Sequence, residues 1–105
     1  MRSLPFLLIA GFVLVMLAAG EADAEKEPLW NYTTGDDVLS VVISADGEYI
    51  VAISDDRNLS LFNKNSSTPL WTERIGKIYS VDISADGEYI VTGDNDYIYL
   101  LGKDN

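Results

Sequence analysis

The chain has 105 residues, of which 17 are Asp or Glu and 7 are Lys or Arg, and it contains neither Cys nor His. This length has room for one small domain, and the missing residue types exclude disulfide scaffolds, thiolate metal sites, ordinary zinc sites and Ser-His-Asp catalysis. A formal net charge of −10 argues against binding to nucleic acid or to an anionic lipid surface, because both need a basic protein surface.

The first 24 residues differ from the rest of the chain. After Arg2, the 17 residues from Leu4 to Gly20 carry no charge, and Ala22-Asp23-Ala24 has the small residues of a signal-peptidase site. This layout predicts a signal peptide over residues 1–24. An uncleaved anchor is the alternative, since 17 apolar residues are at the lower limit for a membrane span. Either way, we expect residues 25–105 to be extracytoplasmic (secreted, periplasmic or cell-surface), with membrane contact only through an uncleaved anchor.

The remaining chain consists mainly of one sequence unit that occurs twice. The nine residues ISADGEYIV occur at positions 43–51 and again at 83–91, an offset of 40. Pro-Leu-Trp occurs in both copies, with Trp30 in the repeat 28–68 and Trp71 in the repeat 69–105. Internal repeats of this period are typical of solenoids and propellers. Residues 25–105 are therefore expected to form one two-repeat segment.

The residue pattern of each repeat predicts short strands and no helix. Apolar and polar residues alternate over 38–44 and 78–84, the period of a half-buried strand. The dipeptides Asp46-Gly47 and Asp86-Gly87 follow, and they predict tight hairpins in which the glycine has a positive φ. The strands expected in chain order are 28–33, 38–44, 48–53, 59–63, 69–71, 78–84, 88–92 and 97–101.

Four antiparallel strands in about 40 residues make one β-propeller blade. We therefore expect an all-β chain of two four-stranded antiparallel repeats, with segment 28–33 acting as the fourth strand of a blade whose other strands lie elsewhere. Rings need about four to eight blades. The chain is thus expected to be a partial propeller or the protomer of a ring, formed by three or four copies.

Two stretches resemble known propeller families. SVxISADGEYIV resembles the first two strands of a WD-repeat blade. LFNKNSSTPLW resembles the tryptophan-docking segment of pyrroloquinoline-quinone-type propellers, with Asn63 where that pattern has Asp and Ser66-Ser67 where it has Thr-Gly. The resemblance implies that the indoles of Trp30 and Trp71 pack between neighbouring blades.

Several residues have a structural and a functional interpretation. The tryptophans could stack on sugars, and the acidic turns at 55–56 and 94–96 could bind Ca²⁺. We favour packing for the tryptophans and turn formation for the acidic residues. Asn31, Asn58 and Asn65 each begin an N-glycosylation triplet. We assign structural roles to the residues that recur in both repeats, namely Trp30, Trp71, Asp46, Gly47, Asp86 and Gly87.

These observations favour a non-catalytic, extracytoplasmic propeller module that binds a protein partner or an unidentified ligand. No catalytic residue, cofactor or metal ligand is assigned. Two alternatives stay open. One is a piece of a quinoprotein-like enzyme whose cofactor residues lie outside this chain, and the other is an oligomeric propeller lectin.

Overall fold

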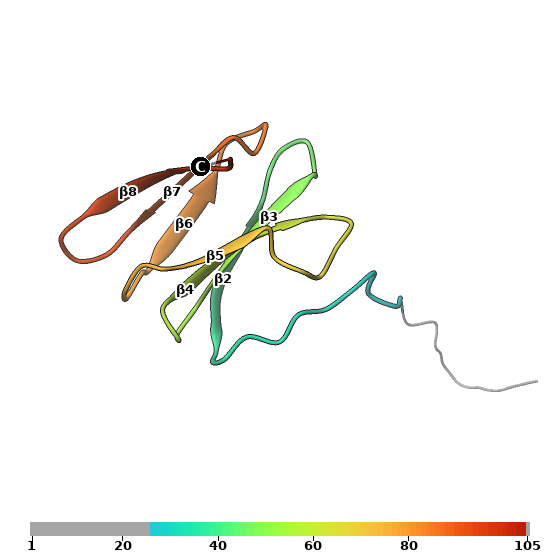
Figure 1. Cartoon of the computed structure of the whole chain (residues 1–105), viewed down its shortest axis with the longest axis horizontal. Coiled ribbons are helices and arrows are strands. Elements are labelled where there is room, and N and C mark those ends of the chain that lie inside the picture. The colour runs from blue at the N-terminus through green and yellow to red at the C-terminus, as the bar shows by residue number, and fades with distance from the viewer. Residues whose placement is uncertain (1–25, 105) are drawn as a thin grey trace, which may run out of the picture.

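The computed structural model describes residues 26–104, which form seven strands joined by turns. The signal peptide predicted over residues 1–24 lies outside this range. The strands form two antiparallel sheets, which we call blade 1 and blade 2 (Figure 1). Blade 1 contains β2 (Val38–Ile43), β3 (Tyr49–Ser54), β4 (Asn58–Asn63) and β5 (Trp71–Arg74). Blade 2 contains β6 (Ser80–Ile83), β7 (Tyr89–Gly93) and β8 (Ile98–Gly102).

Each blade is a meander, because every strand pairs with the next strand along the chain. The expected all-β fold with propeller-type blades is confirmed. Ile43 pairs with Ile50 in blade 1, and the repeated residues Ile83 and Ile90 pair in the same way in blade 2. No helix that could cross a membrane occurs between residues 26 and 104.

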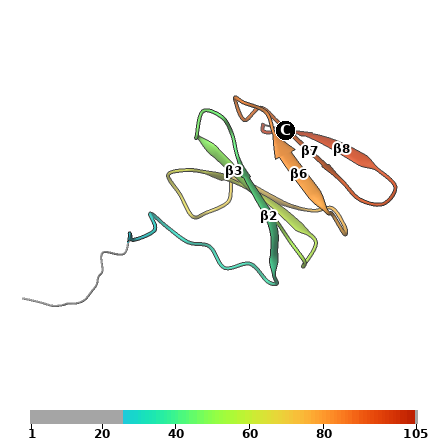
Figure 2. The same cartoon turned by 180° about the vertical axis from the view of Figure 1, so that it is seen from behind.

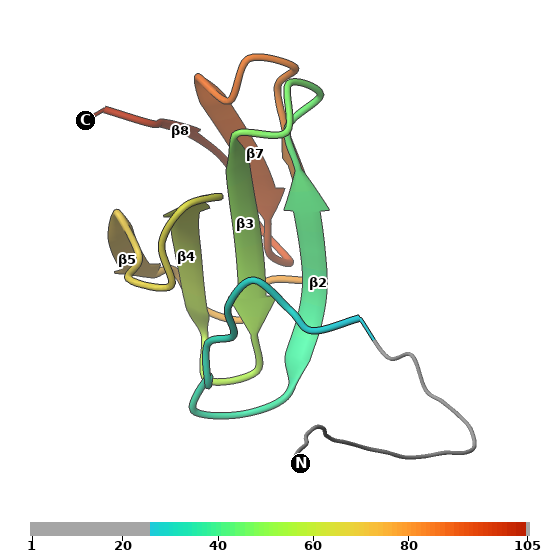
Figure 3. The same cartoon turned by 90° about the vertical axis from the view of Figure 1, so that its right-hand side faces the viewer.

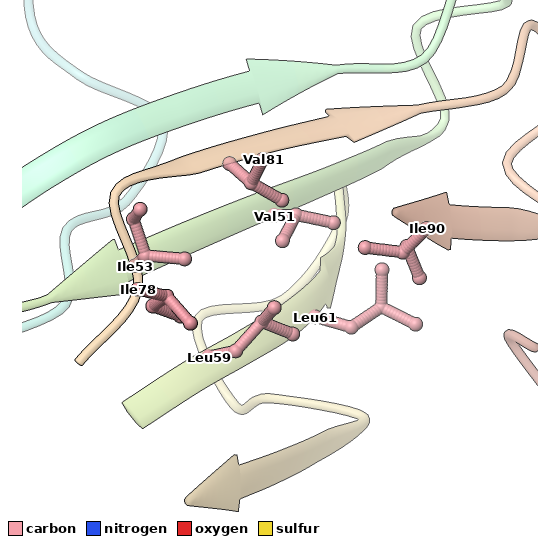
Figure 4. Close-up of a cluster of buried hydrophobic side chains, with 7 residues drawn as sticks. All are labelled: Val51, Ile53, Leu59, Leu61, Ile78, Val81 and Ile90. Atoms are coloured by element: carbon pink, nitrogen blue, oxygen red, sulfur yellow. The ribbon is translucent and has the colours of Figure 1, made fainter. Parts of the chain in front are cut away.

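The hydrophobic core lies between the two blades. Side chains from β3 and β4 point toward β7 and the segment that leads into β6, as Figure 4 shows. The seven buried residues of this cluster are Val51, Ile53, Leu59, Leu61, Ile78, Val81 and Ile90. Burial of this apolar surface at about 25 cal/mol per Å² is the main stabilising term for so small a fold. The core is therefore the contact between one blade and the next.

The outer strand of blade 1 begins later than expected. The sequence pattern predicted residues 69–71, whereas β5 spans Trp71–Arg74. Its bounds are set by pairing with β4, in which Leu61 is opposite Trp71 and Asn58 is opposite Arg74. The other predicted strands differ from the observed ones by one or two residues at their ends. This is the usual uncertainty at strand termini.

The prediction of a strand over residues 28–33 is wrong for this structure, where the segment has no strand conformation. The physical reason is that an outer strand needs a third strand as its hydrogen-bonding partner. The only third strand without an outer neighbour among the described residues is β8, which lies on the far side of blade 2 (Figures 1 and 2). Blade 2 therefore has three strands from this chain, as the order of the repeats predicts, and the segment crosses the outward face of blade 1 instead (Figure 3).

Candidate functional site

The two Asp-Gly hairpins have the same hydrogen-bonded geometry. Gly47 and Gly87 have φ values of +74° and +78°, the left-handed conformation that glycine adopts without steric cost. The Ser44 hydroxyl donates to Asp46 Oδ1 over 2.6 Å, and the Glu48 backbone N–H donates to the same oxygen over 3.0 Å. Ser84, Asp86 and Glu88 repeat these contacts at 2.9 and 3.0 Å. The aspartates thus fix the turns.

These hydrogen bonds also change the acidity of the aspartates. The Ser44 hydroxyl and the Glu48 N–H lower the pKa of Asp46 below 3.8, because both bonds favour the carboxylate over the acid. For Asp86, the N–H of Glu88 and then the Ser84 hydroxyl lower the pKa in the same way. Both groups are therefore ionised hydrogen-bond acceptors at neutral pH and not proton donors.

The turn expected at the acidic residues 55–56 has the same hydrogen-bonded geometry, which the sequence analysis did not predict. Ser54 donates to Asp56, the N–H of Asn58 donates to Asp56 Oδ1 over 3.2 Å, and the N–H of Arg57 donates to the Ser54 carbonyl over 3.0 Å. Arg57 occupies the glycine position with a φ of +74°. The spacing Ser-x-Asp was visible in the sequence, but Arg replaces the glycine that marks such a turn.

Both tryptophans bind a backbone carbonyl of the blade that follows them. The Trp71 Nε1–H donates to the Lys103 carbonyl of blade 2 over 2.9 Å, and the Trp30 Nε1–H donates to the Lys64 carbonyl of blade 1 over 2.8 Å. The Trp30 ring also lies 5.3 Å from the Phe62 ring, centroid to centroid. The indole N–H groups are consequently occupied by hydrogen bonds within the protein.

The two carbonyl acceptors are held by equivalent contacts. The N–H groups of Lys64 and Lys103 donate to the carbonyls of Glu48 and Glu88, each over 2.9 Å. The lysine ammonium groups lie 3.1 and 3.7 Å from the carboxylates of the same two glutamates. Trp30 is therefore bound to blade 1 in the way that Trp71 of β5 is bound to blade 2. This is the contact of an outer strand from a preceding blade.

The acidic turns serve the fold. The carboxylate of Asp94 accepts the N–H groups of Asp96 and Tyr97, each over 2.8 Å, and the Tyr99 hydroxyl over 2.9 Å. Asp56 is engaged in its own turn in a similar way. Across residues 26–104, no three His, Cys, Asp or Glu side chains are arranged to hold a metal ion.

The outward face of blade 2 is open, whereas the outward face of blade 1 is partly covered by segment 28–33, whose Trp30 and Tyr32 rings pack on Phe62. The side of blade 1 that faces away from blade 2 is called the leading face, and the opposite side of blade 2 is called the trailing face. The leading face consists of Val38, Val41, Ile43, Ile50 and Ala52. The trailing face consists of Asp82, Tyr89, Val91, Ile98 and Leu100. Ile98 is 84% exposed and Leu100 is 69% exposed, so large apolar side chains stand in water on this face.

Both outward faces duplicate surfaces that are buried inside the same chain. Position by position, the trailing face of blade 2 corresponds to Val42, Tyr49, Val51, Leu59 and Leu61 of blade 1. The leading face of blade 1 corresponds to Ile78, Val81, Ile83, Ile90 and Thr92 of blade 2. These two inner surfaces pack against each other around the hydrophobic core. An exposed apolar surface of this kind marks an interaction site.

Comparison with known proteins supports the propeller fold. The structure is similar to the WD40 domain of SCAP from fission yeast, with a TM-score of 0.62, 15% identity, and coverage of 72% of this chain and 19% of that one. It is also similar to a structure titled as the complex of the fission yeast SREBP–SCAP binding domains, with a TM-score of 0.60, 14% identity, and coverage of 79% and 22%. Ph1500 of Pyrococcus horikoshii is similar at a TM-score of 0.51 and 18% identity, over 86% of this chain and 54% of that one. The chain thus spans about a fifth of the length of the fission yeast chains.

No curated protein matches the sequence significantly. The resemblance to pyrroloquinoline-quinone-type propellers stays a prediction. The model of the family described as "WD domain, G-beta repeat" matches residues 26–63 and 69–100. The two matches follow the two sequence repeats, so the second match contains β5 together with the strands of blade 2. The chain belongs to the WD40 repeat family.

Proposed function

We propose that this chain is a non-catalytic protein-interaction module that works outside the cytoplasm. WD40 propellers generally act as protein-interaction scaffolds. The observation that carries the proposal is the open apolar trailing face, because side chains as exposed as Ile98 and Leu100 are the kind that a partner covers.

The polar groups support a scaffold and not a catalyst. The most perturbed carboxylates, those of Asp46, Asp56, Asp86 and Asp94, have lowered pKa values because turn N–H and O–H groups bind them. A general acid at neutral pH needs a raised pKa instead.

The extracytoplasmic location is part of the proposal and follows from the signal-peptide pattern of residues 1–24. A ring of three or four copies is also part of it. A head-to-tail contact repeats the same rotation at each step, and six or eight blades fall within the size of known propeller rings.

Site-specific photocrosslinking in the exporting host tests the interaction function. A photoreactive residue at Ile98, on the trailing face, is expected to give a discrete adduct with a protein. The matched control is a photoreactive residue at Asn95, which lies in an exposed turn beside the same strand. Adducts equal in amount and pattern at both positions, or none at Ile98, would contradict the proposal.

The location is tested on the same material. The exported protein is expected to begin at Glu25, and N-terminal sequencing identifies this residue. A protein recovered only from the cytoplasm would contradict the extracytoplasmic part of the proposal, whereas an exported protein that begins at Met1 would favour the uncleaved anchor.

A further inference from the structure

The contact between the two blades contains a tyrosine that packs on a glycine. A Cβ added to Gly87 would lie 2.4 Å from Tyr49 Cδ2, so the Tyr49 ring rests where any larger residue would have a side chain. The Lys103 Nζ lies 5.2 Å from the centroid of this ring, within the range of a cation–π contact. Blade 1 thus inserts Tyr49 into a site on blade 2 that Gly87 and Lys103 form.

The residues at the equivalent positions of the other repeat do not make this contact between tyrosine, glycine and lysine. Tyr89 corresponds to Tyr49, and its side chain is 58% exposed. Gly47 corresponds to Gly87, and a Cβ built there would meet no described atom within 4 Å. Lys64, which corresponds to Lys103, lines a hollow together with Gly47 and Trp30. The chain therefore presents the tyrosine at one end of the blade pair and an empty site for it at the other.

We propose that a second copy of this chain fills this site, with the trailing face of one copy on the leading face of the next and Tyr89 inserted between Gly47 and Lys64. This inference rests on the proposed interaction function and names its partner. A second copy is the occupant that the structure supports, because its residues correspond position by position to those already in contact inside each chain. The Asp46 N–H, which donates to the Ala85 carbonyl over 3.1 Å across the blades, has its equivalent in Asp86 and Ala45.

The same placement supplies β8 with an outer strand. In blade 1, Ser60 lies opposite Thr72 and Leu61 opposite Trp71. By equivalence, Tyr99 of one copy lies opposite Asn31 of the next copy, and Leu100 lies opposite Trp30. Within one chain these segments are at opposite ends of the blade pair (Figures 1 and 2). The outer strand must therefore come from the second copy, by the addition of a strand to an open sheet edge.

One position weakens the contact between copies. Val42 packs against the core between the blades, but its equivalent on the trailing face is Asp82. The Asp82 carboxylate accepts the Ile83 N–H over 2.8 Å, and contact with an apolar surface removes its remaining hydration without adding a partner. Asp82→Val restores the residue used inside the chain and is expected to tighten self-association about tenfold, the effect of roughly 1.4 kcal/mol.

Sedimentation of the purified exported protein tests the face contact. The wild type is expected to associate, and Tyr89→Ala is expected to weaken association by about tenfold or more, as loss of a central aromatic anchor does. Tyr79→Ala is the matched control, because Tyr79 is equally exposed, at 56%, but belongs to neither face. Equal effects of the two substitutions, or a folded wild type that is monomeric at all concentrations, would overturn the proposal.

Disulfide crosslinking tests the strand contact, since the chain has no cysteine of its own. An Asn31→Cys chain mixed with a Tyr99→Cys chain is expected to form a mixed disulfide, because directly opposed Cβ atoms lie about 4.5–5.5 Å apart. An Asn31→Cys chain mixed with a Leu100→Cys chain is the control, since those side chains point to opposite faces of the sheet. This comparison tests the strand contact even if the protein aggregates, because non-specific contact would crosslink both mixtures to the same extent.

Failure of this inference is distinguishable from failure of the proposed function. Photocrosslinks from Ile98 to a different protein, together with no register-specific disulfide, would overturn self-association and leave the interaction function standing. No adduct from Ile98, together with no register-specific disulfide, would overturn both.

Discussion

Arg57 has a backbone conformation that is unfavourable for a residue with a side chain. Its φ of +74° places a Cβ in a conformation that costs about 1–2 kcal/mol relative to glycine. The turn is retained because Asp56 accepts the N–H of Asn58, and the Arg57 carbonyl accepts the N–H of Ile75 over 3.1 Å. Neither bond involves the arginine side chain, so a smaller residue preserves both.

We predict that Arg57→Gly raises the free energy of unfolding by about 1 kcal/mol. The reason is relief of the left-handed strain, which two homologous turns in this chain avoid with Gly47 and Gly87. Urea unfolding measures the change. Arg57→Ala is the control, because it removes the side chain but keeps the Cβ, and a gain as large as that of the glycine variant would show that strain is not the cause.

The hairpin aspartates give the fold a defined response to acid. The pKa of Asp46 is lowered from 3.8 in the folded state, so its stabilising contribution is complete above that value and is lost as pH falls through the folded pKa. We predict that Asp46→Asn is less stable than the wild type near neutral pH and that this difference shrinks below pH 3.8. Thermal unfolding at a series of pH values measures it. A difference in stability that does not change with pH would mean that the charge of the Asp46 carboxylate does not stabilise the fold.

At the scale of elements, each tryptophan joins an outer segment to the blade that follows it. The two contacts contribute differently to stability. Trp71 belongs to β5 and packs against the core between the blades. Trp30 holds a segment that has no strand pairing. Loss of the first contact loosens both blades, whereas loss of the second releases only the segment before β2.

We predict that Trp71→Phe lowers the free energy of unfolding by about 1 kcal/mol, which is the net value of one hydrogen bond, and that Trp30→Phe lowers it less. Chemical denaturation in a Leu100→Asp background measures both changes, because a charge on the trailing face removes any contribution from self-association. A larger loss for Trp30→Phe would contradict the assignment of Trp71 as the tie between the blades.

How much of each element could be predicted depended on which signal defines it. The hairpins β2–β3 and β6–β7 were predictable, because apolar alternation and Asp-Gly both mark them. The bounds of β5 were not, since residues 71–74 are mostly exposed and pairing with β4 alone fixes them. The acceptors of the indole N–H groups are backbone carbonyls of Lys64 and Lys103, and a backbone acceptor leaves no mark in the sequence. The site made by Gly47 and Lys64 was likewise invisible, because it is defined by the contact that its repeat equivalent makes.

At the scale of the whole molecule, apolar faces and net charge act against each other. Residues 25–105 carry 15 acidic and 6 basic side chains, so copies that approach one another are repelled, while burial of the leading and trailing faces is attractive and nearly independent of salt. The proposed contact joins the copies through apolar side chains, one tyrosine and backbone hydrogen bonds, with no ion pair needed between them.

We therefore predict that self-association strengthens with ionic strength. Raising salt from about 0.01 M to about 0.1 M shortens the Debye length from about 30 Å to about 10 Å, which screens the repulsion between copies but leaves the apolar contact intact. Sedimentation equilibrium at the two ionic strengths measures the change, and Asp82→Val is expected to associate more tightly at both and to depend on salt less steeply, because it removes one negative charge from the contact. Association that weakens as salt is added would instead indicate a contact held by ion pairs, and the docking of the trailing face onto the leading face would then be wrong.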